Sequence, residues 1–296
     1  MKALATAALV LLPALALAQQ EDLSKVQVKS TPVAGNVHML EGEGGNIGVS
    51  VGPDGLLLVD DQFAPLVPKI RAALRKLNKG KLEYVLNTHF HPDHTGGNAA
   101  LGREATIVAH EAVRERLSKD YKRGEEMVRA SPKVALPVIT YKQGVSLWFN
   151  GEEVRVTHLP AGHTDSDSAV LFVGSNVLHM GDQFIMGGFP FIDRDGGGTV
   201  DGYLQNVETV LAGLPPDVRI IPGHGPLATR ADLERFVGMM RETAALVREK
   251  KAAGKTLEQV KAEGLPEKFK SWGEGFISTE LWLHTLYKGG LSRSER

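Results

Sequence analysis

The most constraining feature of this 296-residue chain is a run of metal-binding side chains within one short segment. Three histidines and one aspartate fall between positions 89 and 94: His89, His91, Asp93 and His94. Imidazole nitrogen and carboxylate oxygen are ligands that zinc and similar divalent metals prefer. The whole chain has only ten histidines, so composition does not explain this density. A histidine-rich surface tract is the alternative. The run lies between a predicted strand and the pair Gly96-Gly97, which favours a metal site built by the fold.

The first eighteen residues are predicted to be a secretory signal peptide. Lys2 gives a basic start, residues 3–18 are almost wholly apolar, and Ala16-Leu17-Ala18 fits a small-residue cleavage site. The apolar run is short for a membrane-spanning helix, and Pro13 interrupts it; a retained anchor is the alternative. We therefore expect residues 19–296 to form the mature protein, secreted or periplasmic, with no stable membrane span after cleavage.

Composition excludes several kinds of chemistry. The chain has no cysteine, so cysteine nucleophiles, cysteine metal ligands, iron–sulfur clusters and disulfides are excluded. With 34 basic and 35 acidic residues the formal net charge is −1, which does not indicate a phosphate-binding face. We therefore expect a small-molecule substrate and no nucleic-acid partner. The length suffices for one large domain or two small ones, and the oligomeric state stays open.

Hydrophobic periodicity predicts strands followed by helices, twice along the chain. The first half has strands at 37–40, 46–51, 56–59, 84–86 and 105–109, and helices at 67–77 and 111–117. The charged segment 119–133 is predicted to be a helix or a mobile excursion. The second half has strands at 145–149, 154–158, 169–173, 177–180 and 219–221, a glycine-rich loop at 186–198, and helices at 201–212 and 231–251. Two such halves predict two sheets packed face to face with helices outside.

Three further candidate ligands follow predicted strands in short glycine-flanked turns. They are His163, Asp182 and His224. Glycine permits the tight backbone that aims a side chain inward. Each of these residues alone is weak evidence, because a histidine after a strand can simply be a hydrogen-bonded turn residue. Together with the first four they make seven ligands, enough for two adjacent metals that share a carboxylate and a water.

In this order, His89-x-His91-x-Asp93-His94, His163, Asp182 and His224 resemble the motifs of the metallo-β-lactamase superfamily of hydrolases, over essentially the whole mature chain. The resemblance implies an α/β (α+β) fold, a four-layer αββα sandwich, as a single domain over residues 19–296 with a C-terminal helical extension. It also implies two zinc ions per chain at one edge of the sheets. His89, His91 and His163 would hold one ion, Asp93, His94 and His224 the other, and Asp182 would bridge both. Asp93 would also be catalytic, orienting a hydroxide between the metals and relaying its proton.

The function that the resemblance implies is hydrolysis of an ester, lactone, thioester or amide bond. Without a cysteine ligand, and with Asp182 where many β-lactamases have serine, the chain resembles the glyoxalase II, lactonase and phosphodiesterase branches more closely. A weak or promiscuous β-lactamase is an alternative, and a mononuclear iron oxidoreductase similar to the persulfide dioxygenases is another. A nuclease and a periplasmic zinc buffer are the remaining alternatives. The substrate and the native metal stay open.

Several other residues are expected to support the site or the core. One carboxylate of Asp60-Asp61 is expected to hydrogen-bond a ligand histidine, with a plain turn as the equal alternative. The segment Phe189-Pro190-Phe191 is predicted to form a wall or lid facing the substrate, with a packed loop as the alternative. Trp148 is predicted to pack in the core, and Trp272 and Trp282 are predicted to anchor the C-terminal helices.

Overall fold

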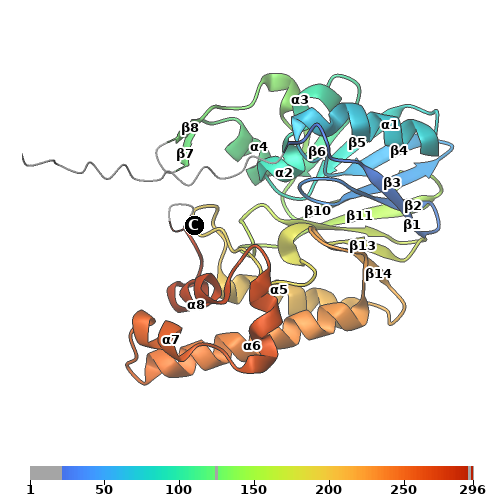
Figure 1. The fold of residues 1–296 in the computed structure, drawn as a ribbon. Helices are drawn as coiled ribbons and strands as arrows, with labels where there is room; N and C mark the ends of the chain where they lie inside the picture. The colour runs from blue at the N-terminus through green and yellow to red at the C-terminus, as the bar shows by residue number, and fades with distance from the viewer. Residues whose placement is uncertain (1–21, 124–125, 293–294, 296) are drawn as a thin grey trace, which may run out of the picture.

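The computed structural model of the chain describes residues 22–123, 126–292 and 295. These residues form four layers in the order helices, sheet, sheet, helices (Figure 1). The predicted αββα sandwich is therefore confirmed. The predicted signal peptide, residues 1–18, lies outside the described residues. Within the described part of the chain, no helix combines the length and apolar character needed to cross a membrane.

The first sheet has seven strands and carries the shorter helices on its outer face (Figure 1). Neighbouring strands are antiparallel as far as the fourth strand and parallel beyond it. The strands, in spatial order, are β1 (Lys29–Ala34), β2 (Val37–Glu41), β3 (Ile47–Gly52), β4 (Gly55–Val59), β5 (Leu82–Asn87), β6 (Thr106–His110) and β9 (Ile139–Tyr141). The helices are α1 (Val67–Leu77), α2 (Pro92–Thr95), α3 (Asn98–Leu101) and α4 (Glu111–Leu117), with the short 3-10 turns η1 (Ala64–Leu66) and η2 (Lys133–Ala135).

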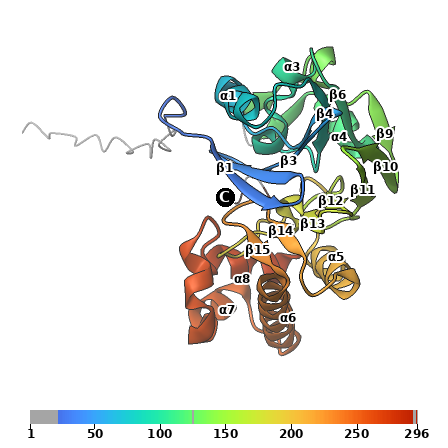
Figure 2. The same cartoon turned by 90° about the vertical axis from the view of Figure 1, so that its right-hand side faces the viewer.

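The second sheet has six strands, and the two longest helices of the described chain lie on its outer side (Figure 2). Only the fourth and fifth of these strands are parallel. The strands are β10 (Gly144–Phe149), β11 (Glu152–His158), β12 (Ser168–Phe172), β13 (Val177–His179), β14 (Arg219–Ile221) and β15 (Ala228–Thr229). The helices are α5 (Val200–Gly213), α6 (Arg230–Ala252), α7 (Leu257–Glu263) and α8 (Thr279–Lys288), with the 3-10 segments η3 (Gly181–Gln183) and η4 (Glu267–Glu274).

The central strands are buried on both faces. On β4, Leu57 and Val59 pack between the two sheets, whereas Leu56 and Leu58 pack under α1 beside Ile70. Side chains alternate across a strand, so a strand with helices on one face and a second sheet on the other must be apolar at every position. This explains the continuous apolar run at positions 56–59. It also anchors β4 rigidly at the edge where the candidate site lies.

Residues 119–133 do not form the predicted helix. This segment contains an antiparallel pair of short strands, β7 (Tyr121–Arg123) and β8 (Glu126–Val128), before η2. Tyr121 faces Val128 across the pair, and both residue types favour extended backbone. These strand preferences outweigh the charge content on which the prediction of a helix rested.

The prediction for Trp148 is also wrong, because 79% of its surface is exposed. Trp148 lies on β10, an edge strand of the second sheet. Its neighbours Leu147 and Phe149 pack in the core between the sheets, so the alternation of the strand turns Trp148 outward. The predictions for the other two tryptophans are confirmed: Trp282 is fully buried under α6, and Trp272 packs against the same cluster.

Candidate metal centre

The seven predicted ligands all follow the ends of strands at one edge of the sandwich. The segment after β5, including the short helix α2, carries four of them, and the segments after β11, β13 and β14 carry one each. In the second sheet β11 is antiparallel to β12, β12 is antiparallel to β13, and β13 is parallel to β14. Their three carboxyl ends therefore lie at the same edge. The structure brings the ligands together in two groups, the first being His89, His91, His163 and Asp182, and the second Asp93, His94 and His224.

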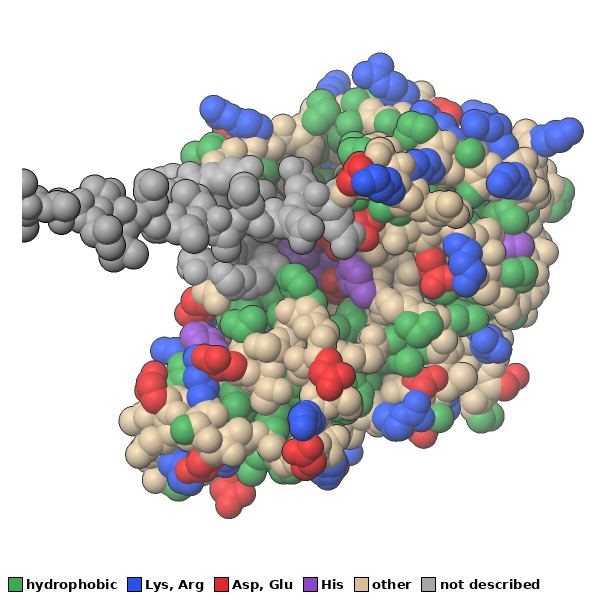
Figure 3. Space-filling view, viewed as in Figure 1, with side chains coloured by type: hydrophobic (Ala, Val, Ile, Leu, Met, Phe, Trp, Pro, Cys, Tyr) green, Lys and Arg blue, Asp and Glu red, His purple; other side chains and the backbone are tan. Residues whose placement is uncertain are grey.

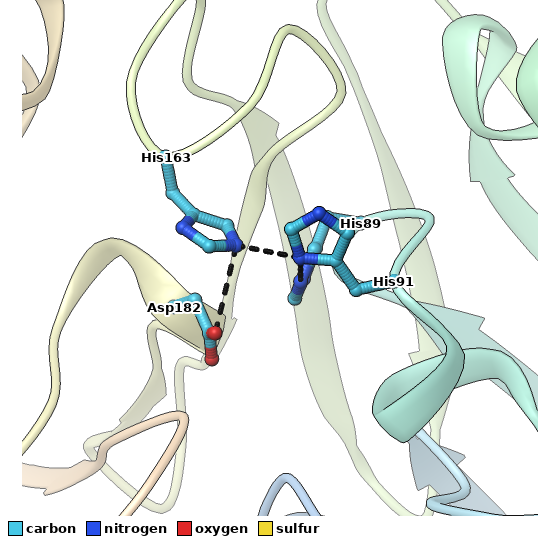
Figure 4. A group of neighbouring side chains, drawn as sticks. All are labelled: His89, His91, His163 and Asp182. Atoms are coloured by element: carbon cyan, nitrogen blue, oxygen red, sulfur yellow. Dashed lines mark hydrogen bonds and ion pairs between the residues drawn. The ribbon is translucent and has the colours of Figure 1, made fainter. Parts of the chain in front are cut away.

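In the first group, three imidazole nitrogens converge. His91 Nδ1 lies 3.1 Å from His89 Nε2 and 2.9 Å from His163 Nε2. Asp182 Oδ2 lies 3.5 Å from His163 Nε2 (Figure 4). Three nitrogens and one carboxylate oxygen around a common point form the kind of donor set that zinc prefers.

Hydrogen bonds on the far side of the rings determine which nitrogens carry protons. His163 Nδ1 donates to the carbonyl oxygen of Phe191 at 2.7 Å, and His91 Nε2 donates to Asp193 Oδ2 at 2.8 Å. Burial lowers the pKa of both histidines, which favours the neutral form. The converging nitrogens of His91 and His163 therefore carry lone pairs that face each other. Such an arrangement is repulsive unless a cation lies between the lone pairs, so these residues fit a metal ion.

In the second group, Asp182 faces the ligands with its other oxygen. Asp182 Oδ1 lies 3.1 Å from His94 Nε2 and 3.4 Å from His224 Nε2. Asp93 Oδ2 lies 3.5 Å from His94 Nε2 and 3.3 Å from His224 Nε2. Among the described residues, the buried atoms His94 Nε2 and Asp182 Oδ1 lie close to each other but form no well-aligned hydrogen bond. Buried polar atoms left in this state indicate a missing partner, and a cation fits both of them.

The charges of the second group suit a cation as well. Burial alone raises the pKa of Asp182, but His224, His94 and His163 outweigh this and hold it well below its usual range. Burial alone lowers the pKa of His224, but Asp182 and Asp93 outweigh this and raise it to about 10. Burial alone likewise lowers the pKa of His94, but Asp182, Asp93 and Asp60 outweigh this and raise it well above its usual value. The metal-free protein thus holds ionised carboxylates balanced by protons on His94 and His224, which a divalent cation can replace.

Asp60 connects the two groups. This confirms the prediction that one carboxylate of the Asp60-Asp61 pair hydrogen-bonds a histidine of the proposed ligand set. Its Oδ2 accepts from His94 Nδ1 at 2.8 Å and from the Thr88 hydroxyl at 2.7 Å. The Thr88 oxygen in turn lies 3.0 Å from His89 Nδ1. Asp61 instead accepts a backbone N–H from the loop after α2. One buried carboxylate therefore orients a histidine in each group.

Asp193, which holds His91, was not among the residues predicted from the sequence. It lies in the loop between η3 and α5, is fully buried, and accepts the backbone N–H of Gly196 at 2.9 Å. The sequence signal for this partner was an aspartate within the glycine-rich segment 186–198.

A pocket of about 640 Å³ opens onto both groups. Figure 3 shows histidine at the bottom of a hollow in the surface, with acidic and hydrophobic side chains around it. Phe189 and Phe191 both border the pocket, but Phe189 is fully buried in the core, as expected for the alternative of a packed loop. Only Phe191, which is partly exposed, fits the predicted wall facing the substrate. Other apolar residues that line the pocket were not predicted from the sequence: Phe63, Tyr121, Ile185 and Phe276.

Comparison with known proteins shows a related family and the same fold elsewhere. Residues 31–224 match a family model described as the metallo-beta-lactamase superfamily. A hydroxyacylglutathione hydrolase of Nitrosococcus oceani is 32% identical over 164 residues, which are 54% of this chain and 55% of that protein. The chain thus spans about half the length of this curated relative.

Two solved structures share the architecture at low identity. A metallo-beta-lactamase from Pontibacter korlensis has a TM-score of 0.61 at 16% identity, covering 73% of this chain and 99% of that one. The stereoselective inverting sec-alkylsulfatase Pisa1 from Pseudomonas sp. has a TM-score of 0.67 at 15% identity, covering 88% and 50%. At these identities the two structures establish the fold alone.

Proposed function

The chain belongs to the metallo-beta-lactamase superfamily, and from this membership and the geometry of the site we propose that it is a dinuclear zinc hydrolase. The observation that carries the proposal is the placement of Asp182. One of its oxygens faces His163 of the first group, and the other faces His94 and His224 of the second. A carboxylate in this position is suited to bridge two ions. All seven proposed ligand positions are histidine or aspartate. This also argues against the alternative of a mononuclear iron enzyme, which uses fewer ligands.

Each residue then has a definite role. His89, His91 and His163 would hold one zinc ion, Asp93, His94 and His224 the other, and Asp182 both. Zinc lowers the pKa of bound water to about 7 and polarises a substrate oxygen, so it would supply the nucleophile near neutral pH. Asp93 lines the pocket, and its side chain is 24% exposed against 12% for Asp182. Asp93 is therefore the carboxylate placed to orient the attacking water and accept its proton.

The proposed reaction is transfer of an acyl group from an ester, lactone, thioester or amide to water. The relative named hydroxyacylglutathione hydrolase supports this reaction class. Hydrolysis of β-lactams would be a minor activity. The test is a panel of lactones, thioesters, phosphodiesters and β-lactams given to enzyme loaded with zinc. Metal analysis should find two zinc ions per chain, and a single iron would contradict the proposal.

Replacement of Asp93 by Asn tests the mechanism. We expect Asp93→Asn to lower kcat by about 10²-fold or more, because the amide cannot accept the proton. Its circular dichroism should match that of the parent protein, since Asp93 lies at the pocket and not in the core. Asp201→Asn, an exposed aspartate on α5, is the control and should keep full activity. Full activity in Asp93→Asn would refute this role.

We also propose that the protein acts outside the cytoplasm. The support is the apolar segment at residues 3–18 with its small-residue cleavage site. N-terminal sequencing of protein from a bacterial periplasmic fraction should find a chain that begins at Gln19. An intact N-terminus on protein from the cytoplasm would contradict export.

A further inference from the structure

We propose that Asn46, a residue of the first half of the sandwich outside the ligand set, positions His224 and thereby governs how tightly the second zinc ion binds. The second ion is the one that Asp93, His94 and His224 would hold together with Asp182. This inference rests on the proposed dinuclear site and adds to it a residue that aligns the two halves there. It follows from the contacts of His224 and from those that Asn46 makes with the turn carrying His224.

His224 is the histidine of the ligand set whose ring has the least support. The other four each hydrogen-bond another residue through the ring nitrogen that faces away from the metal centre. Within the described part of the chain, the hydrogen bonds and ion pairs of the His224 ring are confined to Asp93 and Asp182, which belong to the site itself. The direction of this ring therefore depends on the backbone of the turn at residues 222–225.

Asn46 holds this turn from the other half of the sandwich. It lies directly before β3 and is only 5% exposed. Its Nδ2 donates to the carbonyl oxygen of Pro222 at 2.9 Å and to that of Gly225 at 2.8 Å, and its backbone N–H donates to the carbonyl oxygen of Gly223 at 2.7 Å. The accepting residues lie on both sides of His224. Three hydrogen bonds from one residue therefore hold the backbone from which the His224 ring projects.

The contacts of the Asn46 side chain require an amide. A backbone carbonyl oxygen can only accept, so both protons of Asn46 Nδ2 are used and the orientation of the amide is determined. An apolar side chain at this position would leave two carbonyl oxygens of the turn without these donors. Since unpaired polar groups are costly to bury, the turn would move to find other partners, and His224 would move with it.

The carbonyl oxygen of Asn46 connects the same residue to Asp182. It accepts from His179 Nε2 at 3.0 Å, and His179 Nδ1 accepts the backbone N–H of Gly181 at 3.1 Å. His179 is fully buried, and burial lowers its pKa, so the ring is neutral and has the one donor and one acceptor that these bonds need. Because Gly181 directly precedes Asp182, Asn46 also supports the backbone of the bridging carboxylate.

The residue before Asn46 touches the other two ligands of the second ion. Gly45 N–H donates to the carbonyl oxygen of Asp93 at 3.0 Å. A side-chain carbon at position 45 would lie 2.2 Å from the ring of His94, so glycine lets the segment pass close to this ring. Residues 45 and 46 thus reach all four residues proposed for the second ion. The described hydrogen bonds of Asn46 do not reach the three histidines proposed for the first ion, so we expect an effect on one ion only.

Stepwise zinc binding by the full chain, measured by competition with a chromophoric chelator, tests the proposal. Asn46→Leu keeps the bulk of the side chain and Asn46→Ala removes it, and both lack the two donors. We expect each variant to keep the parent's affinity for one zinc ion and to bind the other about 10- to 100-fold more weakly, as when other partners of metal ligands are lost. Agreement between the two variants would assign the effect to the lost hydrogen bonds.

Asn150→Gly is the matched control. Asn150 is also buried, and its Nδ2 donates across the sandwich to Ser50 Oγ at 3.0 Å and to the carbonyl oxygen of Gly55 at 3.2 Å. It precedes β11, whereas the ligands follow the carboxyl ends of the strands, and glycine accepts its φ of 52°. This variant should be less stable in urea and should keep both zinc affinities.

The double variant Asn46→Leu with His224→Ala tests whether Asn46 acts through His224. If it does, replacing Asn46 should cause no further loss of zinc affinity once His224 is absent, so the two changes should not be additive. Additive losses would contradict a positioning role.

The outcomes separate this inference from the proposed function. Two zinc ions bound with the parent's affinities in both Asn46 variants would overturn the inference, and so would equal weakening of both ions or the same loss in Asn150→Gly. The dinuclear hydrolase proposal would stand in each of these cases. A parent protein that binds fewer than two zinc ions would overturn that proposal and the inference with it.

Discussion

At the scale of single residues, four histidines of the proposed ligand set are each held by a second group. Asp193 and the Phe191 carbonyl hold His91 and His163, and Asp60 reaches one histidine in each group. Such partners orient the imidazole ring and determine its tautomer, so their loss weakens metal binding without removing a ligand. The chemistry of the site therefore depends on residues outside the proposed ligand set.

Asp60→Asn should lower zinc affinity by roughly 10- to 100-fold. The amide has only one acceptor oxygen, whereas Asp60 accepts from His94, from the Thr88 hydroxyl and from the Thr88 backbone. Competition with a chromophoric chelator measures the affinity. Thr88→Ser, which keeps the hydroxyl, is the matched control and should bind zinc as the parent does. Equal affinity in Asp60→Asn would show that Asp60 does not orient the ligands.

Asp167 predicts a pH dependence of stability. It is buried, and it accepts from the Thr164 backbone at 2.7 Å and from Gln183 Nε2 at 2.6 Å. Burial raises the pKa of Asp167 to about 7, from 3.8. Between these values the folded state binds more protons than the unfolded state. This contribution to stability is therefore full below about pH 4 and is lost as the pH rises through 7.

Asp167→Asn should remove this contribution. Urea unfolding of the metal-free parent and variant at pH 5 and pH 8 gives the comparison, because all other titrating groups are shared. We expect the parent to lose more stability than the variant on going from pH 5 to pH 8. An identical loss in both proteins would contradict the raised pKa.

At the scale of elements, the direction in which a strand or helix points a side chain, toward the core or toward solvent, decides how much that residue contributes to the stability of the fold. Trp148 and Trp282 show this directly, since the first points to solvent from β10 and the second is fully buried on α8. Trp282 Nε1 donates to Thr243 Oγ1 on α6 at 3.1 Å, and its ring stacks on Phe189 with centroids 5.3 Å apart. Trp282 thereby attaches α8 both to α6 and to the wall of the pocket.

Trp282→Ala should therefore destabilise the fold by about 3–5 kcal/mol, the cost of a large cavity in a core. Trp148→Ala should change stability by less than about 0.5 kcal/mol, as expected of an exposed site. Both values come from urea unfolding of the zinc-free proteins, which separates packing from metal binding. Comparable losses in the two variants would contradict the packing described for α8.

At the scale of the whole molecule, the metal centre joins the two halves of the sandwich. The first half supplies the residues of the loop after β5, and the second supplies His163, Asp182 and His224. The unfolded chain cannot hold these groups together, so a cation that binds them stabilises the folded state. Zinc at 100 times its dissociation constant should add about 2.7 kcal/mol.

Chelation should accordingly lower the melting temperature, and zinc should restore it in proportion to the logarithm of its concentration. Differential scanning calorimetry with and without a chelator measures the shift. His224→Ala, which removes one proposed ligand, should show a smaller zinc-dependent shift than the parent protein. A melting temperature that does not respond to zinc would be inconsistent with a site shared by both halves.

The sequence by itself determined much of this protein because its signals are local. The apolar run at 56–59 predicts a strand buried on both faces, and the glycine-flanked turns at His163, Asp182 and His224 mark where polar side chains leave the sheet. Periodicity and turn chemistry act over a few residues and can be read along the chain. The order of the motifs, through the family they resemble, then predicted the four-layer fold.

Only the tertiary structure decided which side chains surround the site. Asp193, Phe63 and Phe276 reach it from separate segments, and Trp148 leaves the core because of the alternation of an edge strand. The two oxygens of Asp182 face different groups of ligands only because β5, β11, β13 and β14 end at one edge. Contacts between distant segments depend on how the layers pack, and no local pattern in the chain encodes that packing.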